Sequence, residues 1–312
     1  MLRSFGKKVH RWVDGNPWTN VYGLARTLLA LQSIAVLTVN GVDTLFTPVV
    51  GTHNPPVCTS ITNASLFCLA PEGGLNGARW LAILILLLVA SGWRPRITGV
   101  LHWWVSFSFF AATTLATGGE AITAILTFWL IPLTLTDPRK WHWQHLERRN
   151  SEDVSVYQRF TAWAVYLLIR IQVAAIYLHS AAGKVTVEEW RNGTAMYYWF
   201  TDPAFGLPLW AEFALLPILS YGVVVTAITW GTILLEFFLF AGLVMDKSGW
   251  PYLLWPGIGL HMGIALLIGL PAFSTAMIGA LILYLRPLNQ SFQFNSSTLK
   301  SAPFPSPLFT KV

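Results

Sequence analysis

The sequence predicts an all-α protein that crosses a membrane several times. Apolar residue types make up 54% of the 312 residues and charged types only 11%, whereas a soluble domain carries roughly 25% charged residues. The chain has 16 tryptophans, and indole side chains gather at the interfaces of a bilayer. Long apolar runs alternate with short basic segments. These observations argue against an ordinary soluble enzyme, a disordered chain and a fibrous protein.

Eight apolar segments have about the length of a transmembrane helix, given a rise of 1.5 Å per residue. A basic segment at 1–20 precedes them, and we expect it to be cytoplasmic. A stretch rich in Ser, Pro and Asn at 287–312 follows them, and we expect it to be a flexible tail. The transmembrane domain is therefore expected over 21–286. The predicted spans are 21–39, 75–92, 97–117, 120–136, 160–182, 221–245, 251–269 and 271–286.

One further apolar stretch lies after the fifth span, at 204–220. Pro203, Pro208 and Pro217 interrupt it, and proline in a helix interior removes a hydrogen bond and clashes with the preceding turn. We therefore expect an interfacial or re-entrant segment here, and not a ninth span.

The distribution of Lys and Arg predicts the orientation in the cell membrane. Cytoplasmic loops carry an excess of these residues, and with the N-terminus inside the outer loops contain only Lys184 and Arg191. Both termini are therefore expected in the cytoplasm. The net charge of +6 is explained by these basic loops and does not indicate a nucleic-acid partner. The sequence has neither a Gly-rich phosphate loop nor zinc-finger spacing.

The two cysteines, Cys58 and Cys68, both lie in the first outer loop. Disulfides persist outside the cytoplasm, and the residues between the two cysteines make a closable loop. We expect a structural disulfide. A redox-active pair is the alternative, but the C-x-x-C motif that favours it is missing.

Lys184 stands at the outer end of the fifth span, after the small residues from Ser180 to Gly183. A lysine there commonly extends to the headgroups. The functional alternative is a base, because small neighbours can shelter the amine and desolvation disfavours its ammonium form. Trp190 and Tyr197 follow in a stretch that is either an interfacial aromatic belt or the lip of a site around Lys184.

Three ionisable residues fall inside predicted spans: Arg170, Glu236 and His261. Each lies about ten residues from the cytoplasmic end of its span, roughly 15 Å in. A charge at that depth is costly unless it is paired. We expect an Arg170–Glu236 pair with His261 nearby, acting either as a structural clamp or as a catalytic or proton-relay site.

Glu120 opens the fourth span on the outer side, at the predicted height of Lys184. The helix dipole favours a carboxylate there, which explains Glu120 without a function. The sharper hypothesis is an acid–base pair of Glu120 and Lys184. His142 and His145 have i, i+3 spacing in a cytoplasmic loop, but no further ligands accompany them, and we expect no metal site.

Five stretches carry a likeness to a known family: Ile171 to Tyr177, Gly183-Lys184, Glu189 to Met196, Leu234 to Phe237 and Gly259 to Gly263. Together they resemble the horizontally transferred transmembrane domain, the membrane part of vitamin K-dependent γ-carboxylase. The resemblance covers residues 15–290. The Leu66-Phe67-Cys68-Leu69 loop and the Gly118-Gly119-Glu120 turn resemble one branch, the sporulation-delaying protein B family, whose members are needed to mature a secreted antimicrobial peptide.

In the carboxylase, a lysine at the matching place is the base that deprotonates a reduced vitamin K quinone. The resemblance implies that Lys184 takes this role here, with a reduced, vitamin K-like quinone as the possible cofactor. Glu120 would be its partner, with His179 and Tyr177 behind it. Two features of the carboxylase are missing. Its Asn-His pair beside the quinone is replaced by Gly118-Gly119-Glu120, and we expect no counterpart of its large luminal domain. The implied partners are a peptide toxin precursor, a soluble maturation protein and the lipid bilayer.

Two rival functions remain beside this one. The first is a non-enzymatic chaperone, immunity factor or exporter of the peptide, which would use the charges inside the membrane to hold structure or to pass a proton. The second is a quinone oxidoreductase in which the two cysteines relay electrons.

Overall fold

The computed structural model describes residues 15–48, 55–114, 118–144, 154–288, 290 and 292. In this part of the chain every regular element is a helix, and strand pairing is limited to one isolated bridge between Trp93 and Trp141. Each of the eight predicted spans corresponds to a helix. These are α2 (Asn20–Val39), α4 (Leu75–Ser91), α5 (Pro95–Ala112), α6 (Gly118–Thr136), α8 (Val156–Thr186), α12 (Gly222–Ala241), α13 (Trp250–Leu267) and α14 (Pro271–Leu285).

The predicted all-α membrane fold is confirmed. Helices α2, α6, α8 and α12 are long and apolar enough to cross a membrane by themselves, whereas α4 and α14 are apolar but shorter. Eight crossings stay a prediction. The apolar 204–220 stretch contains α11 (Leu209–Leu219), whose 11 residues fall short of the ~20 that a span needs. The other short helices are α3 (Val42–Leu45), η1 (Ser60–Ala64), α9 (Glu188–Arg191) and α10 (Ala195–Thr201).

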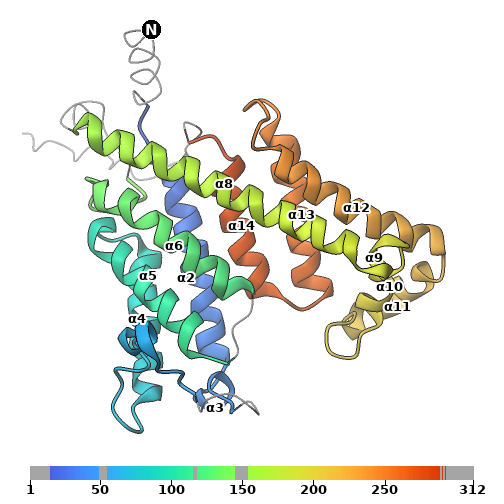
Figure 1. The fold of residues 1–312 in the computed structure, drawn as a ribbon, viewed down its shortest axis with the longest axis horizontal. Helices are drawn as coiled ribbons and strands as arrows, with labels where there is room; N and C mark the ends of the chain where they lie inside the picture. The colour runs from blue at the N-terminus through green and yellow to red at the C-terminus, as the bar shows by residue number, and fades with distance from the viewer. Residues whose placement is uncertain are drawn as a thin grey trace, which may run out of the picture.

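Helix α8 joins the two parts of the molecule (Figure 1). On one side α2, α4, α5 and α6 stand together, and on the other α12 and α13 carry the short helices α9 to α11. Helix α8 crosses obliquely in front of them and packs on α6, α14 and α12. Leu126, Val173 and Leu281 lie in the core that these helices share. The oblique course carries the C-terminal end of α8 to α12, where the candidate site forms.

Local capping explains why α8 is longer than the predicted 160–182 span. The Ser155 hydroxyl accepts a hydrogen bond from the Tyr157 backbone amide, and the Gln158 side chain accepts one from the Ser155 amide. This capping box satisfies donors that a helix start would otherwise leave unpaired. The helix therefore begins in the polar segment before the apolar run, at Val156.

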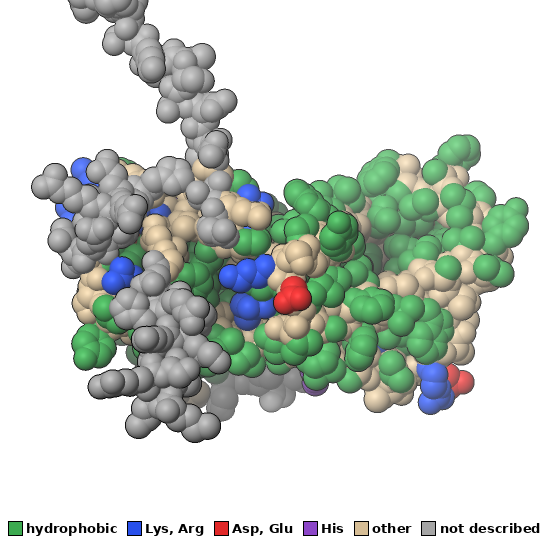
Figure 2. Space-filling view, turned by 90° about the horizontal axis from the view of Figure 1, so that it is seen from above, with side chains coloured by type: hydrophobic (Ala, Val, Ile, Leu, Met, Phe, Trp, Pro, Cys, Tyr) green, Lys and Arg blue, Asp and Glu red, His purple; other side chains and the backbone are tan. Residues whose placement is uncertain are grey.

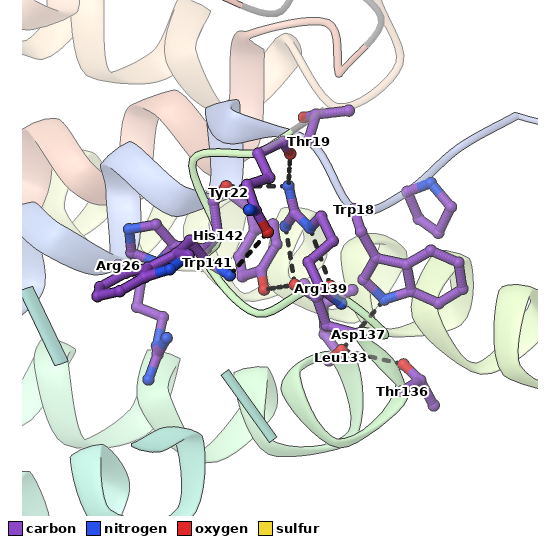
Figure 3. A network of polar contacts seen from close by, with 12 residues as sticks. Trp18, Thr19, Tyr22, Arg26, Leu133, Thr136, Asp137, Arg139, Trp141 and His142 are labelled. Atoms are coloured by element: carbon purple, nitrogen blue, oxygen red, sulfur yellow. Dashed lines mark hydrogen bonds and ion pairs between the residues drawn. The ribbon is translucent and has the colours of Figure 1, made fainter. Parts of the chain in front are cut away.

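A buried polar network fixes the segment that follows α6 (Figure 3). The Arg139 guanidinium donates to both oxygens of Asp137 at 2.9 and 2.8 Å, and the Tyr22 hydroxyl of α2 donates to the same carboxylate. Arg139 also donates to the backbone carbonyls of His142 and Gln144. Because its polar groups find partners inside the protein, this segment can pack against α2 without water.

His142 packs against the end of α4. Gly92 closes that helix with a left-handed φ of 87°, and a Cβ at this position would collide with the His142 ring. Burial, together with the charges of Arg26 and Arg139, lowers the pKa of His142 to about 2, so its ring is neutral at physiological pH. His145 lies outside the described residues, among which no group of three His, Cys, Asp or Glu side chains could hold a metal ion.

We predict that Arg139→Ala lowers the free energy of unfolding by about 3–5 kcal/mol, because it leaves a buried carboxylate without its cation. The neighbouring Lys140 is exposed and provides a matched control, since Lys140→Ala should change the same quantity by no more than about 0.5 kcal/mol. Thermal unfolding of both variants in detergent checks this. Equal losses would show that the Asp137 network does not stabilise the fold.

The predicted disulfide is confirmed, with Cys58 bonded to Cys68 and a Cα–Cα distance of 5.7 Å. The bridge lies in the loop between α3 and α4. Phe67, next to the bridge, is buried and contacts the Phe46 ring at a centroid distance of 5.1 Å. The disulfide therefore holds a loop whose apolar residue packs on the helical bundle.

The disulfide and the predicted orientation can be tested together. We expect a membrane-impermeant maleimide to label Cys58 and Cys68 in intact cells only after reduction. Cys58→Ser should leave Cys68 free and labelled without a reductant. Labelling that required cell lysis would place this loop inside the cell and contradict the orientation.

Candidate functional site

Lys184 forms an ion pair with Glu236. Its ammonium nitrogen lies 2.7 and 2.8 Å from the two carboxylate oxygens and 2.7 Å from the Ser180 hydroxyl oxygen. The Ser180 hydroxyl in turn donates to Glu236 at 3.1 Å. The Lys184 side chain is 20% exposed and that of Glu236 9% exposed. The Glu236 carboxylate is therefore almost fully buried, whereas the Lys184 side of the pair is accessible from the protein surface.

Tyr177 and His261 extend the site inward. The Tyr177 hydroxyl lies 2.9 Å from Nε2 of His261, which belongs to α13. Tyr177 precedes Lys184 by seven residues, about two turns, so both side chains lie on the same face of α8. Both Tyr177 and His261 are buried. Helices α8, α12 and α13 therefore bring five polar side chains close together.

Aromatic side chains cover the outer end of the site. The Lys184 ammonium lies 5.2 Å from the centroid of the Trp190 ring, within cation–π range. Gly193 turns the chain after α9 with φ of 86°, and a Cβ there would meet Thr226 of α12 at 2.8 Å, so a glycine lets this segment lie close to α12. A hollow of about 450 Å³ adjoins this segment. Its lining consists of Val187, Glu189, Trp190, Ala195, Tyr198 and Trp199.

The predicted Arg170–Glu236 pair is wrong. Glu236 pairs with Lys184, and Arg170 lies over the rings of Trp250 and Tyr284, with its Cζ 4.3 and 5.8 Å from the two centroids. The prediction counted residues from the cytoplasmic ends and treated the helices as parallel. Because α8 runs obliquely across the bundle (Figure 1), equal residue counts do not mean equal depth. His261 does lie near Glu236, because it contacts Tyr177, which is close enough to the Glu236 carboxylate to interact with it electrostatically.

The predicted Glu120–Lys184 pair is also wrong, because the carboxylate that Lys184 contacts is Glu236. Glu120 is buried at the start of α6. The adjacent Gly119 faces the backbone of Phe273 in α14, where a Cβ would come within 3.0 Å of the Phe273 Cα atom. Glu120 is therefore buried next to a residue that contacts α14, and a shared predicted height did not bring it to Lys184.

Two other predicted site residues point elsewhere. His179 is exposed and lies on a different face of α8 from the buried Tyr177. Tyr197 is 44% exposed and contacts the Tyr198 ring, but it does not line the hollow. Tyr198 and Ser180 belong to the site and were missed. Ser180 precedes Lys184 by four residues, and this spacing on one helix face was a signal that could have identified it.

In the observed arrangement Lys184 acts as a hydrogen-bond donor. Its nitrogen contacts three acceptor oxygens, two from Glu236 and one from Ser180, and an ammonium has three hydrogens and no lone pair. To accept a proton, Lys184 must first release one, and Glu236 is the group positioned to take it. The geometry suits either a proton relay or a recognition site with paired charges.

Comparison with known proteins identifies relatives that extend over nearly the whole chain. The chain is 38% identical over 282 residues to the sporulation-delaying protein SdpB of Bacillus subtilis (strain 168), covering 90% of this chain and 85% of that protein. The chain belongs to the sporulation-delaying protein B family. It is also 43% identical over 296 residues to the protein YitO of the same strain, covering 94% of each.

No family model matches this member of the sporulation-delaying protein B family, and no solved structure shows significant similarity to it. The likeness to the membrane part of γ-carboxylase therefore stays a resemblance carried by the residues quoted above.

Proposed function

We propose that the chain is a multi-pass protein of the cell membrane that helps to mature a secreted sporulation-delaying peptide, and that it acts at the Lys184–Glu236 pair. Membership of the sporulation-delaying protein B family supports the first part. The ion pair, reachable at the outer end of α8 and next to an aromatic hollow, carries the second part. The peptide precursor and a soluble maturation protein are the partners that this proposal requires.

In this proposal Lys184 is the base. Glu236 takes a proton from the ammonium, and the neutral amine then accepts a proton from a group of the substrate. Ser180 stays within hydrogen-bond distance of both and keeps the amine oriented. Tyr177 and His261 form the buried wall behind the pair.

The hollow beside Trp190 suits an apolar segment of a peptide. Its lining includes the aromatic rings of Trp190, Tyr198 and Trp199 and a single acidic side chain, Glu189. Such rings bind apolar groups over a large area. A peptide with an apolar side chain in this hollow would pass in front of the exposed edge of Lys184.

A reduced quinone fits this site poorly. Neither Lys184 nor Glu120 lines the hollow. The Trp190 ring, which does line it, lies 5.2 Å from the Lys184 ammonium. A ring held among Trp190, Tyr198 and Trp199 would have no polar contact with the proposed base. We therefore derive no step through a quinone.

The hydrogen bonds that the Lys184 ammonium already makes favour a second candidate function. In this alternative the chain is a non-enzymatic chaperone, immunity factor or exporter of the peptide. A lysine whose three hydrogens already point at acceptors can hold two helices together or recognise a carboxylate without any chemistry. In that case the peptide changes its location and keeps its covalent structure.

The intact mass of the peptide separates the two candidates. Cells that carry the wild-type chain, Lys184→Ala or the exposed control Lys140→Ala should be compared at equal membrane levels of the protein. A mass or cleavage change lost only in Lys184→Ala supports maturation. The same peptide mass in all three, with at most a different location, would exclude the role of Lys184 in chemistry on the peptide.

A further inference from the structure

A second hollow lies at the opposite end of α8 from the Lys184 site. It has a volume of about 400 Å³, and its wall comes from α8, α13, the end of α14 and the chain before α2. Three cations line it, namely Arg170, Lys247 and Arg286. The rest of its wall is largely aromatic and apolar, with Trp250 and Tyr284 next to Arg170.

The three cations have no anionic partner among the residues that the structure describes. In the described part of the chain none of them forms an ion pair, and the buried Nε atoms of Arg170 and Arg286 have no hydrogen-bond partner. Within the described residues, Arg286 donates to the backbone carbonyl of Gln290 at 3.1 Å, and its Cζ lies 3.9 Å from the centroid of the Phe292 ring. Asp246 is adjacent to Lys247 in the sequence but is exposed and pairs with none of the three. A cluster of like charges in a partly apolar hollow is unfavourable unless an anion joins it.

Lys and Arg side chains are visible near the middle of the face that Figure 2 shows from above, next to acidic and among mostly hydrophobic side chains. In the predicted orientation Lys247 lies in the cytoplasmic loop between the sixth and seventh predicted spans, and Arg286 lies at the cytoplasmic end of the eighth. The cytoplasmic leaflet carries anionic lipids, and basic pockets between membrane helices on that side bind their headgroups.

We propose that this hollow binds a phosphate group through Arg170, Lys247 and Arg286. Guanidinium groups donate parallel hydrogen bonds to phosphate oxygens, and lysine adds a point charge. The aromatic and apolar wall accommodates the glycerol and the start of the acyl chains when the phosphate belongs to an anionic phospholipid. A soluble phosphate compound presents the same oxygens to the same cations.

Native mass spectrometry of the purified full-length protein tests the proposal. Binding of phosphatidylglycerol and of phosphatidylcholine is compared for the wild-type chain, for Lys247→Gln/Arg286→Gln, and for the control Arg96→Gln/Lys140→Gln. The control removes the same charge from exposed positions. We expect the first double variant to weaken phosphatidylglycerol binding at least about tenfold, since two charge-assisted hydrogen-bonding groups are lost, and the control to leave it unchanged.

A second arm identifies the source of the phosphate. Thermal unfolding in detergent is followed with inorganic phosphate and with glycerol 3-phosphate, and it also shows that each variant is folded. Preferential binding of phosphatidylglycerol without protection by the soluble compounds supports a lipid headgroup. Protection lost only in Lys247→Gln/Arg286→Gln supports a soluble phosphate compound. Equal binding of both lipids without protection, or equal losses in the two double variants, would overturn the proposal.

Discussion

Replacing Lys184 with arginine should reduce production of the mature peptide at least about a hundredfold, the usual contribution of a general base. Arginine keeps a positive charge and can pair with Glu236 through two hydrogen bonds. It does not give up its proton in proteins. Lys184→Arg therefore removes only the ability to act as a base, whereas Lys184→Ala also removes the ion pair.

The peptide is measured by intact mass and by activity in the culture medium, with the membrane level of each variant checked by immunoblotting. Arg191→Lys provides a matched exchange of the same two residue types, at an exposed position in the adjacent helix α9, and should have no effect. Peptide at the wild-type level from Lys184→Arg would show that the charge alone is needed, which is the result expected for a chaperone or exporter.

Glu236→Ala should lower the free energy of unfolding by about 3 kcal/mol, at the low end of the range for removing one partner of a buried ion pair. The lower value is expected because the Lys184 side chain keeps one-fifth of its exposure. Glu188, which is exposed on α9, supplies the control, and Glu188→Ala should stay within about 0.5 kcal/mol of the wild type.

The double variant Lys184→Met/Glu236→Leu should recover most of that stability. Replacing both charges by apolar side chains of similar volume is often neutral or stabilising. The Ser180 hydroxyl, which loses both partners, can bond to the backbone carbonyl one turn earlier in α8. Thermal unfolding of the two single variants and the double variant measures the coupling. Additive losses would contradict a direct interaction between Lys184 and Glu236.

The fold could largely be predicted from the sequence, because apolar runs of nearly membrane-spanning length are a strong signal. All eight predicted spans correspond to helices, and the proline-interrupted 204–220 stretch contains only the short α11. The disulfide followed from two cysteines in one loop. The missed part was the direction of α8. Its oblique course depends on packing against α6, α14 and α12, which no local pattern encodes.

That single error explains the incorrect pairs in the site. Glu236 and His261 were selected as ionisable residues within apolar spans, Lys184 as a lysine at the end of a span, and Tyr177 as a residue behind it. The structure brings these four together. Arg170 was assigned to the same depth by counting residues, yet it lies at the other hollow. Burial of a charge marks a residue as important, but its partner depends on helix crossing angles that the sequence does not reveal.

The central claim is that the Lys184–Glu236 pair acts in peptide maturation and does more than hold α8 to α12. The most direct test is the intact mass of the peptide from cells that carry Lys184→Met/Glu236→Leu, a variant expected to insert and to be stable. The account predicts no mature peptide at a wild-type membrane level of the protein. Mature peptide at the wild-type level would contradict it and would leave the pair a structural clamp.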